Sequence, residues 1–165
     1  MRLIKSFPPI TGKHPKILIL GTMPGRASHA ANEYYAYKHN HFWKLIYEIF
    51  DARQETAYSK KAGFLREKHV ALWDVLRRCR RPGSSADSAI KGETPNDIAA
   101  FIKRYASIKH IYFNGRQAEK YFKKYFGNSI KLPLHTLPST SPANAGLTFQ
   151  RKLARWKKIR AAYIK

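Results

Sequence analysis

Cysteine and acidic side chains are both scarce in this chain of 165 residues. Cys79 is the one cysteine, and ten aspartates and glutamates stand against 32 lysines and arginines. A single cysteine excludes an internal disulfide framework and any zinc site built from several cysteines, and it fits a reducing compartment. Cys79 itself is either a nucleophile or a small buried residue, and the sequence leaves both interpretations open.

Long apolar runs are missing as well. No segment approaches the roughly 20 apolar residues that a membrane span requires. The basic stretch before Pro8 also lacks the apolar core of a signal peptide. We therefore expect a cytoplasmic protein without a membrane partner.

Several ligand motifs are absent from the turn that follows the first apolar run. It holds neither a Gly-Lys-Ser/Thr phosphate loop nor a Gly-x-Gly-x-x-Gly dinucleotide pattern. His39 and His41 lie two residues apart, but no third ligand stands at motif spacing. We expect no metal site.

Positive charge is the property that this chain has in excess. Its formal net charge is +22, far more than solubility requires, and such a surface favours a polyanionic partner, with nucleic acid the leading candidate. The alternative is a merely basic or ribosome-associated protein. One stretch has no acidic residue among its cations and predicts phosphate contact: Arg151, Lys152, Arg155, Lys157, Lys158 and Arg160.

The pattern of apolar residues predicts an α/β fold in one domain, residues 1–165. Branched apolar runs predict strands at about 16–21, 69–75, 109–113 and 130–137. Helical spacing predicts helices from His41, over 57–67, from Thr94 with Pro95 at its first position, over 116–126 and over 149–164. Residues 76–87 are expected to form a loop. Alternating strands and helices imply a mostly parallel sheet of about four strands with helices on both faces.

Polar residues gather after the predicted strands, at 21–40, 74–87, 114–115 and 137–144. Because ligands of open α/β sheets bind outside the carboxyl ends of the strands, these loops predict one composite site. Glu33, Asp74 and Asp87 are the carboxylates in these loops. Asp74 is either a general base or the cap of a turn, and Asp87 is open to the same two interpretations.

Three features of these loops also remain ambiguous. Asn40 either caps the following helix or offers a neutral amide that orients a water or a substrate. Tyr34, Tyr35 and Tyr37 either pack in the core or stack on a base. Residues 138–142, Pro-Ser-Thr-Ser-Pro, either form an ordinary hydroxyl-stabilised turn or donate to phosphate oxygens.

Taken in order, these segments resemble the hypoxanthine-DNA glycosylase branch of the uracil-DNA glycosylase superfamily over nearly the whole chain. The resemblance rests on a set of short motifs: Gly21-Thr22-Met23-Pro24, Tyr34-Tyr35, Asn40-x-Phe42-Trp43, Asp74-Val75-Leu76, Arg81-x-Gly83-Ser84 with Asp87, Pro95-Asn96-Asp97, Phe113-Asn114-Gly115, and residues 137–145.

The resemblance implies a three-layer α/β/α fold with a central four-stranded sheet. It also implies a monofunctional glycosylase that flips a deaminated base out of DNA and cleaves its N-glycosidic bond, with hypoxanthine favoured and uracil second. No cofactor is implied, and the protein would act as a monomer on single- or double-stranded DNA in the nucleoid.

The same resemblance suggests roles for particular residues. Asn40 matches the catalytic asparagine. The base pocket would comprise Gly21, Thr22, Met23, Pro24, Tyr35, Phe42 and Asn114. The DNA backbone would contact Arg81, Ser84, Pro138, Ser139, Thr140, Ser141 and Pro142. The best-known members carry an aspartate in the first motif and begin the second with histidine, whereas this chain has Thr22-Met23 and Ser139. The competing hypothesis is a basic nucleic-acid-binding protein without catalysis.

Overall fold

A parallel sheet of four strands forms the centre of the computed structural model, which describes residues 2–83, 86–143 and 146–164. The strands are β2 (Ile17–Gly21), β3 (Val70–Asp74), β6 (His110–Asn114) and β7 (Leu134–Leu137), in the order β3-β2-β6-β7. All three strand pairs are parallel. Every residue of β2 is buried, as expected for a central strand covered on both faces.

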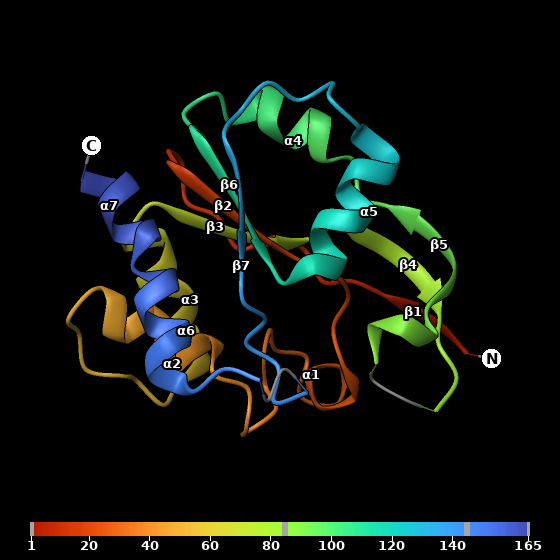
Figure 1. Cartoon of the computed structure of the whole chain (residues 1–165), viewed down its shortest axis with the longest axis horizontal. Helices are drawn as coiled ribbons and strands as arrows, with labels where there is room; N and C mark the ends of the chain where they lie inside the picture. Colours follow the sequence, from red (N-terminus) through yellow and green to blue (C-terminus); the bar gives the residue numbers. More distant parts are fainter. Residues whose placement is uncertain (1, 84–85, 144–145, 165) are drawn as a thin grey trace.

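Helices cover both faces of this sheet (Figure 1). On one side lie α2 (Phe42–Ile49), α3 (Tyr58–Glu67), α6 (Phe149–Trp156) and α7 (Lys158–Ile164), and on the other lie α4 (Ile98–Arg104) and α5 (Arg116–Phe126). Alternate residues of β2 serve the two layers. Ile17 and Ile19 belong to the first apolar cluster and Leu18 and Leu20 to the second. The predicted three-layer α/β/α class is confirmed.

A second, antiparallel sheet was not expected from the sequence. It has the order β1-β4-β5, with β1 (Leu3–Lys5), β4 (Leu76–Arg80) and β5 (Lys91–Pro95). The prediction of a loop over 76–87 is therefore wrong for its first half. The arginines of β4 hide its strand character. Its partner β1 lies more than 70 residues earlier, and its pairing with the nearer strand β5 is irregular in register.

Several boundaries also differ from the prediction. Thr94 and Pro95 end β5, and the helix begins at Ile98, where the Asp97 side chain accepts a hydrogen bond from the Ala100 N–H at 3.0 Å. The terminal helix is divided into α6 and α7. Two short helices, α1 (Arg26–Ala31) and the 3₁₀ turn η1 (Asp87–Ala89), lie within predicted loops. Cys79 is fully buried, which supports the packing interpretation over the nucleophile.

Candidate active site

A cleft of about 1560 Å³ opens at the carboxyl ends of the parallel strands. The loops that follow β2, β6 and β7 contribute to it, together with the end of β3 and the segment after β4, as the composite-site prediction requires. Most of the predicted site residues line this cleft: Gly21, Thr22, Met23, Pro24, Tyr35, Asn40, Asn114, Pro138, Ser139, Thr140, Ser141 and Pro142. Asp74, the last residue of β3, and Asp87, which follows β4, line it as well.

Three predicted site residues do not stand among the described residues that line the cleft. Phe42 is fully buried, and its ring lies against that of Tyr35, with the centroids 4.1 Å apart and the planes at 22°. Arg81 is also buried and points inward. Ser84 lies outside the described residues, as do Asn144 and Ala145. In this structure Tyr35, rather than Phe42, presents an aromatic ring to the cleft.

Gly21 ends β2 in a space that has no room for a side chain. A Cβ atom added there would lie 2.6 Å from Asp74 Oδ1 and 2.7 Å from the Tyr35 hydroxyl. Gly21 and Asp74 are also register partners in the β2–β3 pair. The glycine is therefore required because of this close approach, which lets the carboxyl and the phenol converge on the floor of the cleft.

Asp74 lies in an environment that disfavours its charged form. Asp74 is only 3% exposed, and its Oδ2 has no hydrogen-bond partner among the described residues. Burial, and secondarily the negative charge of Asp87, raise the pKa of Asp74 to about 8, although the Arg81 guanidinium acts in the opposite direction. A raised pKa favours the protonated form of this carboxyl, and that form can donate a hydrogen bond.

Asn114 links three parts of the site instead of presenting free donors. Its Nδ2 donates to the Tyr35 hydroxyl and to Thr140 Oγ1, both at 3.0 Å. Its Oδ1 accepts the Thr140 N–H, also at 3.0 Å. Both amide hydrogens are thus used within the protein. This arrangement fixes Tyr35, whose backbone has a left-handed φ of 54°, to the ends of β6 and β7.

Asn40 takes the structural one of the two roles that its position suggested. Its Oδ1 accepts the Phe42 N–H at 2.9 Å, so that the side chain stabilises the start of α2 although His41 is the capping residue. The neighbouring His41 N–H donates to the Thr140 carbonyl at 3.0 Å. Asn40 lines the cleft, and its Nδ2 has no hydrogen-bond partner among the residues described. The amide orientation is thus fixed through Oδ1.

Arg81 and Asp87 support the turn after β2 from behind. Arg81 Nη2 donates to the Pro24 carbonyl at 2.6 Å, and its Nη1 lies 3.6 Å from Asp87 Oδ1. Burial raises the pKa of Asp87, whereas a hydrogen bond with Thr22 and the charge of Arg81 oppose that rise. In this structure Arg81 is an internal support of the cleft wall.

Residues 138–142 form a turn stabilised by their own hydroxyl groups. Ser139 Oγ accepts the Ser141 N–H at 3.2 Å, and Ser141 Oγ accepts the Ala143 N–H at 3.3 Å. Two residues of α6 hold the segment in place, because Trp156 Nε1 donates to the Pro138 carbonyl at 2.9 Å and Lys152 Nζ donates to the Ser141 carbonyl at 3.4 Å. In both of these bonds within the turn the hydroxyl oxygen is the acceptor.

The basic residues of α6 do not form one exposed face. Lys152 is 1% exposed, and burial lowers the pKa of its ammonium. Arg155, by contrast, lines the cleft. The prediction that all these cations contact phosphate is wrong for Lys152, which lies beneath the turn.

Comparison with known proteins agrees with this architecture. Residues 8–161 match the family described as the Uracil DNA glycosylase superfamily. This chain belongs to that superfamily. The resemblance inferred from the ordered motifs is thereby confirmed, and so is the enzyme class, because members of this superfamily are DNA glycosylases.

Individual relatives cover most of the chain. A Methanosarcina acetivorans protein named hypoxanthine DNA glycosylase is 33% identical over 156 residues, 94% of this chain and 96% of that protein. A Methanosarcina barkeri protein of the same name is 31% identical over 118 residues, 71% of this chain and 74% of that protein. A Methanosarcina acetivorans protein with a provisional uracil DNA glycosylase name, solved by NMR in solution, superposes with a TM-score of 0.86 at 29% identity, covering 99% of this chain and all of that one.

Asp74 lines the cleft but is missing from the base pocket predicted from the sequence, which leaves it as either a general base or a turn cap. The sequence signal for it is a carboxylate at the end of the apolar run Val70-Ala71-Leu72-Trp73.

No cluster of three His, Cys, Asp or Glu side chains able to hold a metal ion occurs in the described part of the chain. None of its described helices has the length and apolar character to cross a membrane.

Proposed function

We propose that this glycosylase removes hypoxanthine from DNA by hydrolysing the bond between the base and deoxyribose, leaving an abasic site. The observation that carries this proposal is the superfamily cleft in a chain whose two relatives, at 33% and 31% identity, are named hypoxanthine DNA glycosylase. Uracil is the second candidate base, since one or two pocket contacts decide such a preference.

Access to the base requires that its nucleotide leave the duplex. Flipping costs a few kcal/mol, less at a mismatched or damaged pair. The formal charge of +22 favours approach to DNA. Inside the cleft, the ring of Tyr35 would stack on the flipped base, and its firm support by Phe42 at 4.1 Å would keep that surface in place.

Asp74 would contact the base as a neutral acid. When the N-glycosidic bond breaks, its electron pair moves onto the base, and negative charge develops there. An O–H donor aimed at the base stabilises the transition state, in which this charge develops, more than it stabilises the bound substrate. This difference lowers the barrier and accelerates the reaction. Asn114 is the less suitable donor because its amide hydrogens already bond Tyr35 and Thr140.

Asn40 would place the water that attacks the sugar carbon. Oδ1 is fixed by the Phe42 N–H, and Nδ2 points to no described partner, so the amide is oriented before substrate arrives. A neutral amide suffices where the leaving base is the activated group and the sugar resembles an oxocarbenium ion. The water adds its oxygen to the sugar carbon and releases one proton to solvent.

The rim of the cleft would hold the bent DNA backbone. Arg155, Arg116 and Arg26 line it together with residues 138–142, and these side chains would pair with phosphate oxygens. We propose that residues 1–165 act as one unit and as a monomer, on single- or double-stranded DNA, in the cytoplasmic compartment that contains the nucleoid.

A cleavage assay tests the proposed reaction. Labelled oligonucleotides with one hypoxanthine or one uracil, in duplex and single-stranded form, would be incubated with the protein, treated with alkali and examined for strand breaks. Strand breaks at hypoxanthine support the proposal. Strand breaks at uracil alone would identify uracil as the substrate base instead. Tight, salt-sensitive binding without any break would favour the competing hypothesis of a non-catalytic nucleic-acid binder.

A further inference from the structure

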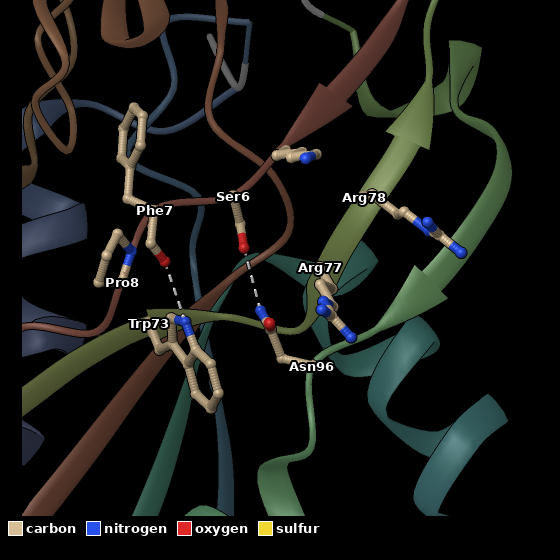
Figure 2. Close-up of a pocket in the computed structure, with 8 residues that line it drawn as sticks. Ser6, Phe7, Pro8, Trp73, Arg77, Arg78 and Asn96 are labelled. Atoms are coloured by element: carbon tan, nitrogen blue, oxygen red, sulfur yellow. Dashed lines mark hydrogen bonds between the residues drawn. The ribbon is translucent and has the colours of Figure 1, made fainter.

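A second, smaller pocket of about 280 Å³ lies between the N-terminal segment and the junction of β3 with β4 (Figure 2). Its described lining comprises Lys5, Ser6, Phe7, Pro8, Trp73, Arg77, Arg78 and Asn96. None of these residues stands among those that line the base cleft. The pocket thus has its own wall, with three cationic side chains and no carboxylate among the described lining residues.

An irregularity in β4 brings two consecutive arginines to this pocket. Side chains of successive residues in a regular strand point to opposite faces. The register of β4 against β5 shifts between Leu76 and Arg78 and again between Arg78 and Arg80, and a bulge of this kind redirects side chains. As a result Arg77 and Arg78 both line the same pocket (Figure 2).

Lys5 adds a third positive charge directly opposite. It is the register partner of Arg78 in the antiparallel β1–β4 pair, and like charges at such positions repel each other and destabilise the sheet. Lys5, Arg77 and Arg78 form no ion pair with any carboxylate in the described part of the chain. An anion bound between them would relieve this repulsion.

The remaining lining residues are Ser6, Phe7, Pro8, Trp73 and Asn96, and hydrogen bonds already order this wall. Trp73 Nε1 donates to the Phe7 carbonyl at 3.1 Å, and Asn96 Nδ2 donates to Ser6 Oγ at 3.2 Å, as Figure 2 shows. Asn96 Nδ2 also bonds the Asp74 carbonyl at 2.8 Å, which joins the pocket to the end of β3. A ligand would therefore lose little free energy in ordering this wall.

We infer that this pocket is a second phosphate site, which takes a phosphodiester of the DNA backbone away from the flipped nucleotide. Planar guanidinium groups match phosphate oxygens in pairs, so Arg77 and Arg78 hold the phosphate and Lys5 adds a point charge. The apolar surface of Trp73 and Pro8 packs against the adjoining sugar or base. The phosphate of a free nucleotide has the same chemistry and is the other source that a test must separate.

The salt dependence of DNA binding tests this inference. The variant Arg77→Gln with Arg78→Gln is compared with the control Lys13→Gln with Lys131→Gln, which removes the same charge from exposed lysines that precede β2 and β7 at the other edge of the sheet. Affinity for an undamaged duplex is measured by fluorescence anisotropy at several salt concentrations. Loss of this one phosphate contact reduces the magnitude of the slope of log affinity against log salt by about 0.9.

A slope in the arginine variant equal to that of the control variant would overturn the inference. Melting temperatures of both variants establish that each is folded. Single-turnover cleavage at saturating enzyme remains at the wild-type rate in the arginine variant, because the pocket shares no described lining residue with the cleft. If the wild type did not cleave, the base-removal proposal would fail. If the arginine variant had the slope of the control, the phosphate site would fail, so the two failures are distinguishable.

Nuclear magnetic resonance separates the two sources of phosphate. The Trp73 indole N–H and the Asn96 amide signals are followed during titration with undamaged duplex DNA and, separately, with inorganic phosphate and a deoxynucleoside monophosphate. The backbone site is supported if DNA shifts these signals in the wild type but not in the arginine variant. Shifts with free phosphate or the nucleotide, accompanied by an unchanged DNA slope in the arginine variant, would overturn the role in DNA binding.

Discussion

The carboxyl group of Asp74 and the hydroxyl of Tyr35 converge on the same small space above Gly21. A Cβ atom at Gly21 would lie 2.6 Å from the first and 2.7 Å from the second. These two side chains come from the end of β3 and from the loop before α2, segments about 40 residues apart in the sequence. Their convergence defines the floor of the base cleft.

The variant Gly21→Ala should therefore lose both activity and stability. The added methyl group forces Asp74 and Tyr35 apart, and overpacking of this kind typically costs about 1–3 kcal/mol. Thermal unfolding and single-turnover cleavage measure the two effects. Gly63→Ala is the matched control, since a Cβ there has no neighbour within 4 Å; a similar loss in both variants would contradict the steric explanation.

Cleavage should decline as the pH rises through about 8. The pKa of Asp74 is raised to about 8, so the neutral form that donates to the base disappears above that value. Asp87 and Arg81 are the charged groups that act on this carboxyl. Tyr34 and Tyr35 also interact with its charge, but burial raises the pKa values of both tyrosines, so that they remain neutral near pH 8. Single-turnover rates between pH 5 and 10 provide the measurement.

Asp74→Asn separates the proton from the donor. Asparagine keeps an N–H donor but does not titrate, so the alkaline decline in cleavage should vanish. A decline that persists would belong to another group.

The stability of the folded protein should also depend on the protonation of Asp74. Because the folded pKa lies above the ordinary value of 3.8, the folded state binds the extra proton, and stability falls from about pH 4 to about pH 8. Asp74→Asn should flatten that fall in thermal unfolding.

Asn40 allows its two amide atoms to be tested separately. Asn40→Ala removes the contact with the Phe42 N–H and the free Nδ2, and should lower the cleavage rate by roughly 10²–10⁴-fold and stability by about 1 kcal/mol. Asn40→Asp retains an acceptor for Phe42 and should restore stability but not cleavage. Wild-type cleavage in Asn40→Asp would show that Oδ1 alone is needed. DNA affinity should change little in either variant.

Asn114 should contribute mainly to the stability of the site. Asn114→Ala leaves the Thr140 N–H without its acceptor and releases the Tyr35 hydroxyl, and the loss of buried hydrogen bonds costs about 1–3 kcal/mol. Thermal unfolding would reveal this loss. If the residue acted only by contacting the base, the variant would instead melt at the wild-type temperature and lose cleavage alone.

The local pattern of residues was sufficient for the main architecture. Apolar runs such as Ile17–Gly21 and His110–Asn114 are recognisable because a strand buried on both faces needs uninterrupted apolar side chains. Loops with glycine, asparagine and serine follow these strands, and since parallel strands end at one edge, the place of the cleft also followed from the sequence.

The tertiary structure decided what depends on distant partners. Strand β4 is recognisable only in the folded sheet, because its arginines give no apolar signal, its pairing with β1 spans more than 70 residues and its pairing with β5 is irregular. Phe42 and Tyr35 have similar rings, and only packing places the first beneath the second.

Charge state and orientation are likewise properties of the folded chain. The pKa of an aspartate is ordinarily 3.8, and burial together with the nearby charge of Asp87 raises the pKa of Asp74 in the folded chain. Arg81 belongs to a basic sequence that predicts DNA contact, yet it turns inward to bond the Pro24 carbonyl. Sequence determined which residues reach the carboxyl edge of the sheet, whereas burial and hydrogen bonding decided what each of them can do there.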